Sequence, residues 1–212
     1  MTDRETLSQQ AYKTIRQHIL DGTFSAGDLL SERVLAEESG ISRTPLRSAI
    51  SRLENEGMLA RLANGTLMVH RITVEQLLEI VQIRRLLEAA AAGKAAAFPL
   101  TPALRRSRDV MRAYAGGRHA VFDQFWLDDE DFHLAVAEAS GLHLLPSLLK
   151  DMRSMARLCT ITRTHDRFEE QALEHLAVID AIEAGDVAGA AAAMERHFDS
   201  ARTRFLAWLA HP

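Results

Sequence analysis

After Thr73 the sequence has helical periodicity throughout, and this limits the possible folds more than any other feature. Apolar residues recur every three or four positions, and no stretch alternates apolar and polar residues as a half-buried strand would. Breaks that contain proline, glycine or a short polar pair divide the region into six segments. The predicted helices are 74–97, 102–115, 118–139, 142–164, 167–184 and 186–209. Residues 73–212 are therefore predicted to form an all-α bundle of about six helices.

Residues 1–72 have a different pattern, which predicts three short helices followed by a hairpin. The first helix is marked by apolar residues at helical spacing: Leu7, Ala11, Ile15 and Ile19. Thr44 is predicted to cap the third helix, with Pro45 at its first position. Asn64-Gly65 is a strong signal for a tight turn between two short strands. The fold class is therefore mainly α, with an N-terminal winged helix-turn-helix at 1–72 and a helical domain at 73–212.

The charge of the chain is acidic overall but unevenly placed. The sequence of 212 residues has 25 Lys+Arg against 29 Asp+Glu, a net charge of −4, which by itself argues against a nucleic-acid partner. Residues 41–53, however, contain three arginines and no acidic residue. Arg43 and Arg47 lie four positions apart, on the helix face opposite Leu46, Ile50 and Leu53. Any contact with nucleic acid is predicted here.

The remaining composition indicates a cytoplasmic protein without a membrane partner. A single cysteine, Cys159, excludes an intramolecular disulfide and fits a reducing compartment. The longest stretch of low charge, residues 89–100, is interrupted by Lys94 and is too short to span a bilayer. The first five residues lack the charged and apolar regions of a secretory signal.

A helix-turn-helix needs a short support helix, a tight turn and a second helix whose first side chains reach the major groove. Arg43 and Arg47 lie at the start of the predicted second helix, where guanidinium groups can bind guanine or phosphate. The hydroxyls of Ser42 and Thr44 suit phosphate oxygens, as do the free backbone N–H groups of a helix start. Arginines on an exposed helix face are also a common solubilising feature, so the pattern leaves a plain charged surface as the alternative.

The same region resembles the winged helix-turn-helix of GntR-family transcriptional regulators. The resemblance covers about residues 8–70 and rests on SERVLA at 31–36, GISRTPLRSAI at 40–50 and LENEG at 53–57. It implies a bacterial regulator that binds double-stranded DNA. The positions that match the family's DNA contacts are Arg33, Arg43, Thr44, Arg47 and Gly65. The hairpin of this sequence has fewer basic residues than most relatives.

Three histidines and one aspartate are predicted to face the core of the bundle from three helices. Asp129 and His133 lie four residues apart, whereas His175 and His197 lie in the apolar stripes of two later helices. An Asp/His pair at this spacing can chelate one ion, and histidines of facing helices can complete the site. Imidazole and carboxylate together suit zinc, nickel, copper, manganese or iron. Each histidine taken singly is better explained as a hydrogen-bonded core residue, and only the set of three with Asp129 favours a metal site.

Arg84 is a basic residue on the inward stripe of the first bundle helix. It is interpreted either as the partner of a buried ion pair with Glu88, one turn away, or as a clamp for an anionic ligand. A guanidinium group binds a carboxylate through two parallel hydrogen bonds, so the second interpretation predicts a small organic acid as ligand.

Residues 74–209 resemble the FCD effector domain of the FadR subfamily of GntR regulators. The matching runs are IRRLLE at 83–88, DEDFH at 129–133, EH at 174–175 with IDAI at 179–182, and MERH at 194–197. The resemblance implies that a divalent metal lies beside a small carboxylate effector. Zinc is the first expectation, with nickel, manganese or iron as alternatives. The implied metal ligands are Asp129, His133, His175 and His197, and Arg84 is expected to bind the effector.

These features together predict a ligand-responsive transcription regulator, a repressor and not an enzyme, that acts as a homodimer on a near-palindromic operator. Three alternatives remain at this stage: a metal-dependent enzyme, a sensor of the metal itself, and a dimerisation module with structural histidines. The enzyme is disfavoured because Glu130 and Asp131 face away from His133. The other histidines of the second region are expected at the surface: His119, His143, His165 and His211. The sequence leaves open the effector, the operator and the metal.

Overall fold

The computed structural model describes residues 5–119, 121–159 and 167–210. The chain forms two compact units, one of residues 1–73 with 154–159 and the other of residues 74–153 with 160–212. The helix predicted to run to residue 164 ends earlier, at Arg157. The predicted break at His165-Asp166 and the surface positions of His165 and His211 lie outside the described residues.

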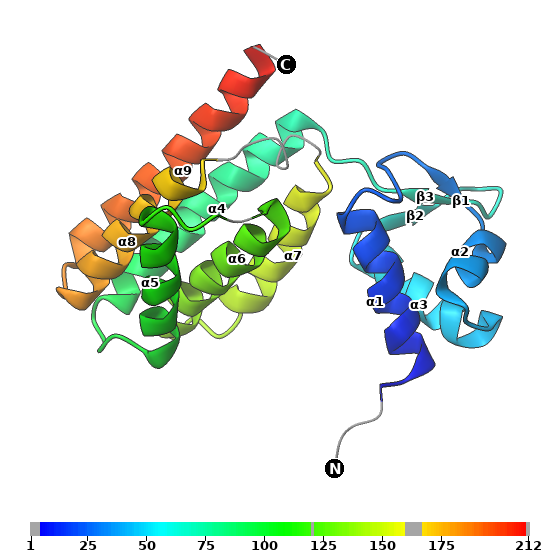
Figure 1. Cartoon of the computed structure of the whole chain (residues 1–212), viewed down its shortest axis with the longest axis horizontal. Helices are drawn as coiled ribbons and strands as arrows, with labels where there is room; N and C mark the ends of the chain where they lie inside the picture. The colour runs from blue at the N-terminus through cyan, green and yellow to red at the C-terminus, as the bar shows by residue number, and fades with distance from the viewer. Residues whose placement is uncertain (1–4, 120, 160–166, 211–212) are drawn as a thin grey trace. The chain divides into compact units, whose positions relative to one another are not determined.

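The N-terminal unit is a winged helix-turn-helix, as predicted (Figure 1). Its order is α1 (Leu7–Leu20), β1 (Leu29–Leu30), α2 (Glu32–Ser39), α3 (Arg43–Asn55), β2 (Leu59–Arg61) and β3 (Leu67–Val69). The three strands form an antiparallel sheet in the order β1-β3-β2. Leu59 pairs with Val69 and Arg61 with Leu67, so β2 and β3 form the predicted hairpin around the turn at Asn64-Gly65. The two-residue strand β1 was not predicted.

Local capping signals explain where the helices of this unit begin, with one correction. The side chain of Ser31 accepts a hydrogen bond from the Val34 amide at 3.2 Å and caps α2. The prediction that Thr44 caps α3 is wrong, because the Leu46 amide donates to the Ser42 carbonyl at 3.3 Å and the first turn therefore starts at Ser42. Pro45 is still accommodated, since amides in the first turn have no partner within the helix.

The core of the N-terminal unit is formed by the predicted inward residues of its helices. Leu46, Ile50 and Leu53 of α3 are fully buried, as are Ala11 and Ile15 of α1, whereas Leu7 at the start of α1 is 54% exposed. A polar contact also joins α1 to the end of α3: the Tyr12 hydroxyl donates to Glu56 Oε2 at 2.8 Å.

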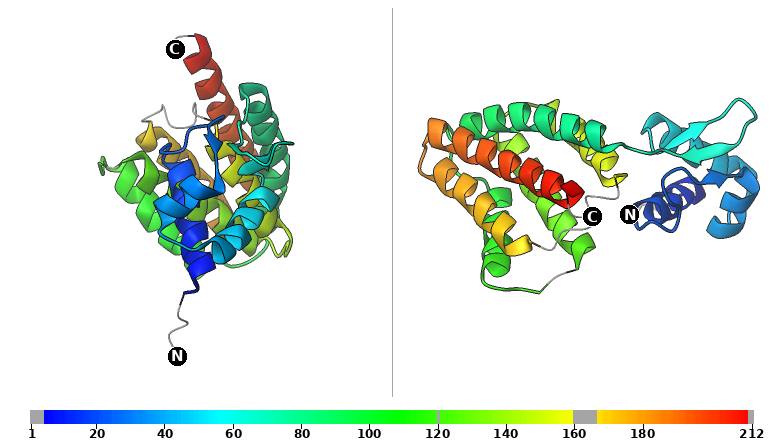
Figure 2. Two further views of the ribbon diagram at one scale, coloured as in Figure 1. Left: turned by 90° about the vertical axis from the view of Figure 1, so that its right-hand side faces the viewer. Right: turned by 90° about the horizontal axis from the view of Figure 1, so that it is seen from above.

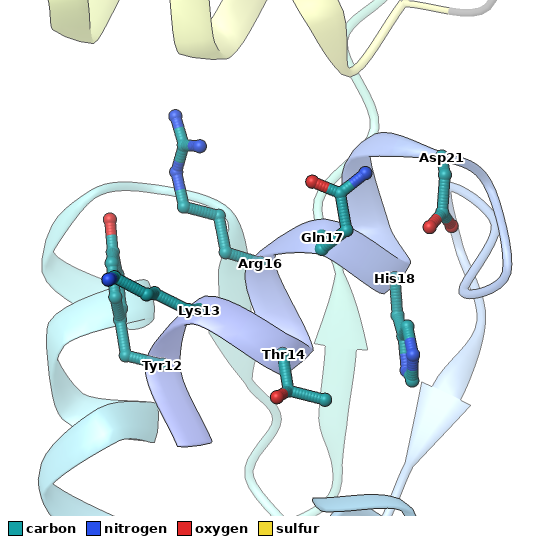
Figure 3. Close-up of a pocket in the computed structure, with 7 residues that line it drawn as sticks. All are labelled: Tyr12, Lys13, Thr14, Arg16, Gln17, His18 and Asp21. Carbon is teal, nitrogen blue, oxygen red and sulfur yellow. The ribbon is translucent and has the colours of Figure 1, made fainter. Parts of the chain in front are cut away.

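Residues of α1 line a pocket together with the helix C-cap, Asp21 (Figure 3). Arg16 and Gln17 extend from the same side of the helix, and Thr14 and His18 lie on the other. The His18 ring contacts Phe24 edge to face, with 5.2 Å between ring centroids. This aromatic contact packs the end of α1 against the chain that follows it.

The second unit contains six helices within the described residues, as predicted (Figure 2). They are α4 (Val74–Ala95), α5 (Pro102–Ala115), α6 (Phe122–Ala139), α7 (Leu145–Arg157), α8 (Phe168–Glu183) and α9 (Val187–Ala210), and α7 belongs to this unit up to Arg153. The starts of α6 and α7 fall four and three residues later than predicted. The backbone of Val121, the N-cap of α6, is extended (φ −86°, ψ 153°), so α6 begins only at Phe122. In the part of the chain that the structure describes, no helix has the length and hydropathy needed to cross a membrane.

The core of the helical unit is apolar around a polar centre. Leu104, Phe132, Val136 and Ile179 are fully buried. α4 packs along α9, and α8 packs against both α5 and α9 (Figure 2). The buried charged and histidine side chains of α4, α6, α8 and α9 lie inside this arrangement.

Leu104→Ala is expected to destabilise the helical unit by about 2–5 kcal/mol, because a fully buried leucine leaves a cavity when it is truncated. Urea unfolding followed by tryptophan fluorescence measures the loss, since Trp126 and Trp208 both belong to this unit. Leu173→Ala is the control: its side chain is 53% exposed, so a change within about 0.5 kcal/mol is expected. Equal effects of the two substitutions would contradict the packing described for α5.

Candidate functional site

The start of α3 presents polar groups to solvent. Ser42, Arg43 and Thr44 are all exposed. The hydroxyl of Ser42 makes no capping hydrogen bond, so it is available to another partner. The backbone N–H groups of the first turn also lack partners within the helix, and a helix N-terminus favours anions. This end of α3 has the chemistry of a phosphate-binding surface.

The predicted DNA-contacting arginines differ in how they are held. Arg47 Nε donates to Glu32 Oε2 at 3.0 Å, and Arg33 Nη1 donates to Glu37 Oε1 at 2.7 Å. Arg43 is exposed and has no hydrogen bond or ion pair within the described residues. Arg47 therefore has a fixed direction with its terminal nitrogens still available, whereas Arg43 is free to move.

The wing is a tight turn in which Gly65 has a φ of +84°. The Gly65 amide donates to the Leu62 carbonyl at 2.8 Å, and the Thr66 amide donates to Asn64 Oδ1 at 3.0 Å. Arg61, which the sequence reasoning missed, donates to the Gly65 carbonyl at 3.3 Å and to Glu54 Oε1 at 2.9 Å. A basic residue thus supports the turn at Gly65.

In the helical unit, the structure brings the three predicted histidines together. His133, His175 and His197 are buried, and each offers a ring nitrogen within 4.8 Å of the others. Asp129 lies beside them, with its Oδ1 at 3.3 Å from His175 Nε2 and 3.7 Å from His133 Nε2. The other carboxylate oxygen, Oδ2, accepts a hydrogen bond from Arg153 Nη2 at 2.6 Å.

Each of the three histidines also uses Nδ1 for a contact outside the cluster. His133 Nδ1 lies 2.5 Å from Glu88 Oε2, and His197 Nδ1 lies 2.8 Å from Glu174 Oε2. His175 Nδ1 lies 3.4 Å from the sulfur of Met111. These contacts fix the orientation of the rings and leave Nε2 of each for a common centre, the arrangement that metal-binding histidines usually have.

Two protein-family models match this chain, one in the N-terminal region and one in the helical region. The model of the bacterial regulatory proteins of the gntR family matches residues 7–69, and the model of the FCD domain matches residues 79–200, more than half of the chain. The chain belongs to the GntR family and has an FCD domain.

Individual relatives align with this GntR regulator over nearly its whole length. A protein of Escherichia coli (strain K12) named "Putative L-lactate dehydrogenase operon regulatory protein" is 31% identical, over 93% of this chain and 85% of that protein. The "Gluconate operon transcriptional repressor" of Bacillus subtilis (strain 168) is 25% identical, over 90% and 81%. The solved structure of E. coli McbR/YncC has the same fold, with a TM-score of 0.77 and 21% identity over 97% of this chain and 99% of that one.

The family and these relatives confirm that the GntR regulator is a DNA-binding transcription regulator and not an enzyme. The alternative of a metal-dependent enzyme built on the helical bundle is therefore excluded.

The surroundings of the cluster favour neutral imidazoles at His175 and His197 and an ionised carboxylate at Asp129. Burial, together with the neighbouring His197, lowers the pKa of His175 well below its usual value, and burial also lowers the pKa of His197. Burial raises the pKa of Asp129, but Arg153, His133 and His175 together outweigh burial, and the pKa is well below its usual range. Neutral imidazole and ionised carboxylate are the protonation states that bind metal ions.

The two carboxylates that contact the histidines are also held ionised. Burial raises the pKa of Glu88, but Arg84, His133 and Arg153 together outweigh burial and bring the pKa down to about 2. Glu174 also has a pKa of about 2, because its hydrogen bonds from His197 and Arg204 outweigh burial. Each can therefore accept a hydrogen bond from an imidazole N–H and fix the tautomer of the ring.

The donor set fits a divalent metal ion. His175 Nε2 is buried and has no hydrogen-bond partner in the described residues, which is costly for an imidazole nitrogen in a closed interior. A metal ion bound by the three histidines and Asp129 would satisfy it. Imidazole and carboxylate ligands suit zinc and other first-row divalent ions.

The surroundings of Arg84 are consistent with both interpretations made from the sequence, an ion pair with Glu88 and a clamp for an anionic ligand. It is buried, its Nε donates to Glu88 Oε1 at 2.8 Å, and its guanidinium lies over the Phe198 ring at 4.9 Å. Its Nη2 is nevertheless buried without a hydrogen-bond partner. The ion pair with Glu88 therefore leaves N–H donors available to an anion.

Sequence reasoning missed three charged residues of this centre. Glu88 was considered only as a partner of Arg84, and Glu174 and Arg153 were given no role. Arg153 could have been found, because it follows Leu149 by one turn on the buried side of α7. The contacts of the two glutamates with histidines of other helices depend on the tertiary fold.

Proposed function

We propose that this GntR regulator, a member of the FadR subfamily, binds its operator as a homodimer in the cytoplasm, with a domain boundary at residues 72/73. The DNA-contacting residues would be Arg33, Ser42, Arg43, Thr44, Arg47 and Gly65. The exposed first turn of α3, with its unused Ser42 hydroxyl, supports entry of this helix into the major groove. Two copies related by a two-fold axis would read half-sites about 34 Å apart.

The helical unit would hold one divalent metal ion through Asp129, His133, His175 and His197, with zinc the first candidate. The observation that carries this part of the proposal is the convergence of three buried histidine rings, each oriented by a separate Nδ1 contact. A bound ion would supply a positive charge at which a carboxylate could bind.

The effector would be a small organic acid held in part by Arg84. The unpartnered Nη2 of this residue supports an anion-binding role. Two relatives are named for the operons of L-lactate dehydrogenase and of gluconate, and lactate and gluconate are both small carboxylates. The second of these relatives is named a repressor, which supports repression as the action of this chain.

Control of DNA binding would follow from a population shift. An acid that binds one arrangement of the helical unit more tightly than another increases the share of that arrangement. If the favoured arrangement binds the operator poorly, the acid relieves repression. A ligand with equal affinity for both arrangements would have no effect on DNA binding, however tightly it bound.

A thermal-shift experiment on the full chain tests the ligand part of the proposal. Zinc, nickel, manganese and iron(II) salts are added singly, and then lactate or gluconate is added with and without each metal. A ligand that binds only the native state raises its melting temperature. An acid that raises it only when metal is present supports the proposal. No shift with any acid would contradict it, and a tenfold change in operator affinity caused by metal alone would show that the metal is the signal.

Arg84→Ala is expected to raise the acid concentration needed for a response by about tenfold or more, the effect of losing a charge-assisted pair, with less than a threefold change in DNA affinity. Acid titrations monitored by fluorescence anisotropy of bound operator measure both effects. Arg84→Lys is the matched variant, since it keeps the charge near Glu88 but loses the planar fork. Equal loss of acid response and DNA affinity in Arg84→Ala would assign Arg84 a structural role only.

A further inference from the structure

One face of α4 is apolar at its middle and open to solvent. Ile83 is 41% exposed and Leu86 is 59% exposed, one turn apart on the same side of the helix. Further exposed residues continue this side of the helix at intervals of three or four. The complete α4 stripe, as we name it, is Gln76, Glu79, Ile83, Leu86, Ala90 and Lys94. α4 lies at an outer edge of the helical unit, beside α9 (Figure 2).

The charges toward the two ends of the α4 stripe are opposite in sign, and neither is paired within the described residues. Glu79 and Lys94 are exposed, and neither makes a hydrogen bond or ion pair within the described residues. Arg85, by contrast, lies on the side of α4 that faces α9 and binds Asp199 and Glu195 there. The stripe thus has an apolar centre, an acid toward one end and a base toward the other.

The side chains of the α4 stripe complement those of a second, antiparallel copy of the same helix. Glu79 and Lys94 lie at equal distances on either side of a point between Leu86 and Leu87, and so do Ile83 and Ala90. At a rise of about 1.5 Å per residue, Glu79 and Lys94 are about 22 Å apart along the helix. In an antiparallel pair of such helices about that point, each Glu79 faces a Lys94, and Ile83 faces the small Ala90. A shallow crossing of about 20° is the packing that brings both ends together.

We propose that the α4 stripe is the two-fold interface through which two copies of the chain associate, with the two α4 helices antiparallel. The inference rests on the homodimer of the proposed function and identifies the surface that forms it. A closed two-fold interface requires a patch that complements itself, and the charge order of the stripe meets this condition. Its centre buries Leu86 against the same residue of the partner, where a charge would be least tolerated.

Leu86→Asp in the full chain tests the apolar centre. Sedimentation velocity over a range of concentrations is expected to show at least a hundredfold rise in the dimer dissociation constant. Leu173→Asp is the matched control, because Leu173 of α8 is 53% exposed but is followed and preceded by acidic residues instead of an apolar stripe. It should leave the dimer unchanged. Circular dichroism checks that both variants keep their helix content.

A charge exchange tests the antiparallel arrangement with substitutions at exposed positions only. Glu79→Lys or Lys94→Glu alone places like charges across the interface at both ends, and each is expected to raise the dissociation constant at low salt by about fivefold or more. The double variant Glu79→Lys/Lys94→Glu restores opposite charges and should recover the dimer. Additive weakening in the double variant would overturn the proposed pairing.

The outcomes separate this inference from the homodimer itself. A wild-type chain that is monomeric at every concentration tested refutes both. A wild-type dimer that persists in Leu86→Asp, or that is lost in Leu173→Asp and not in Leu86→Asp, overturns the α4 interface and leaves the homodimer intact. Loss of the dimer in Leu86→Asp with its retention in Leu173→Asp supports the inference.

Discussion

The double substitution Arg43→Ala/Arg47→Ala is expected to abolish sequence-specific DNA binding. Both residues lie in the exposed first turns of α3, and Arg47 is held in one direction by Glu32. A bidentate arginine–guanine contact contributes about 1–3 kcal/mol of discrimination, so two per half-site and two half-sites amount to about 4–12 kcal/mol. The gap between specific and non-specific binding is typically about 4–10 kcal/mol. The expected loss of binding free energy is therefore as large as the whole difference between specific and non-specific binding.

Fluorescence anisotropy with a duplex selected by the wild-type chain from a random pool measures this loss. The matched control is Arg105→Ala/Arg112→Ala, which removes the same charge from exposed positions of α5 in the helical unit. The control should bind the selected duplex within threefold of the wild type. If the α3 variant binds the selected duplex as tightly as the control does, α3 is not the recognition helix of this regulator.

The winged helix-turn-helix was predictable because its determinants are local. Ser31 before α2, Gly40 after it and the Asn64-Gly65 turn each specify a boundary from adjacent residues alone. The start of α3 was misplaced because Thr44-Pro45 is as good a local signal as Ser42, and only the hydrogen bond to the Ser42 carbonyl decides between them. Strand β1 exists by pairing with β3, and two residues are too few to show alternation.

The clustering of the three histidines was predictable to the extent that helical periodicity specifies an inward face. His133, His175 and His197 each fall on such a face, and their helices bring them together. The groups that orient them could not be inferred, because Glu88 is 45 residues from His133 and Glu174 is 23 from His197. Contacts between residues so far apart in the sequence depend on how the helices pack, which cannot be derived from a single sequence.

His175→Ala is expected to abolish metal binding by the regulator. Wild-type protein should contain about one metal ion per chain, and removal of one of four ligands from a closed site should leave none after purification. The side chain is fully buried and stacks on Phe132 with 4.1 Å between ring centroids, so the alanine also leaves a cavity. Elemental analysis of the purified chain measures the metal content directly.

Thermal unfolding with added zinc distinguishes lost ligation from lost packing. At a metal concentration of about 100 times the dissociation constant, binding stabilises the native state by about 2.7 kcal/mol, so the wild-type melting temperature should rise. The His175→Ala chain should melt lower and show no rise with zinc. His143→Ala is the matched control, since His143 is exposed, and it should respond as the wild type does. If zinc still raises the melting temperature of the His175→Ala chain, the ion binds elsewhere. If the wild-type chain contains no metal and its melting temperature does not respond to zinc, the metal site must be removed from the proposed function.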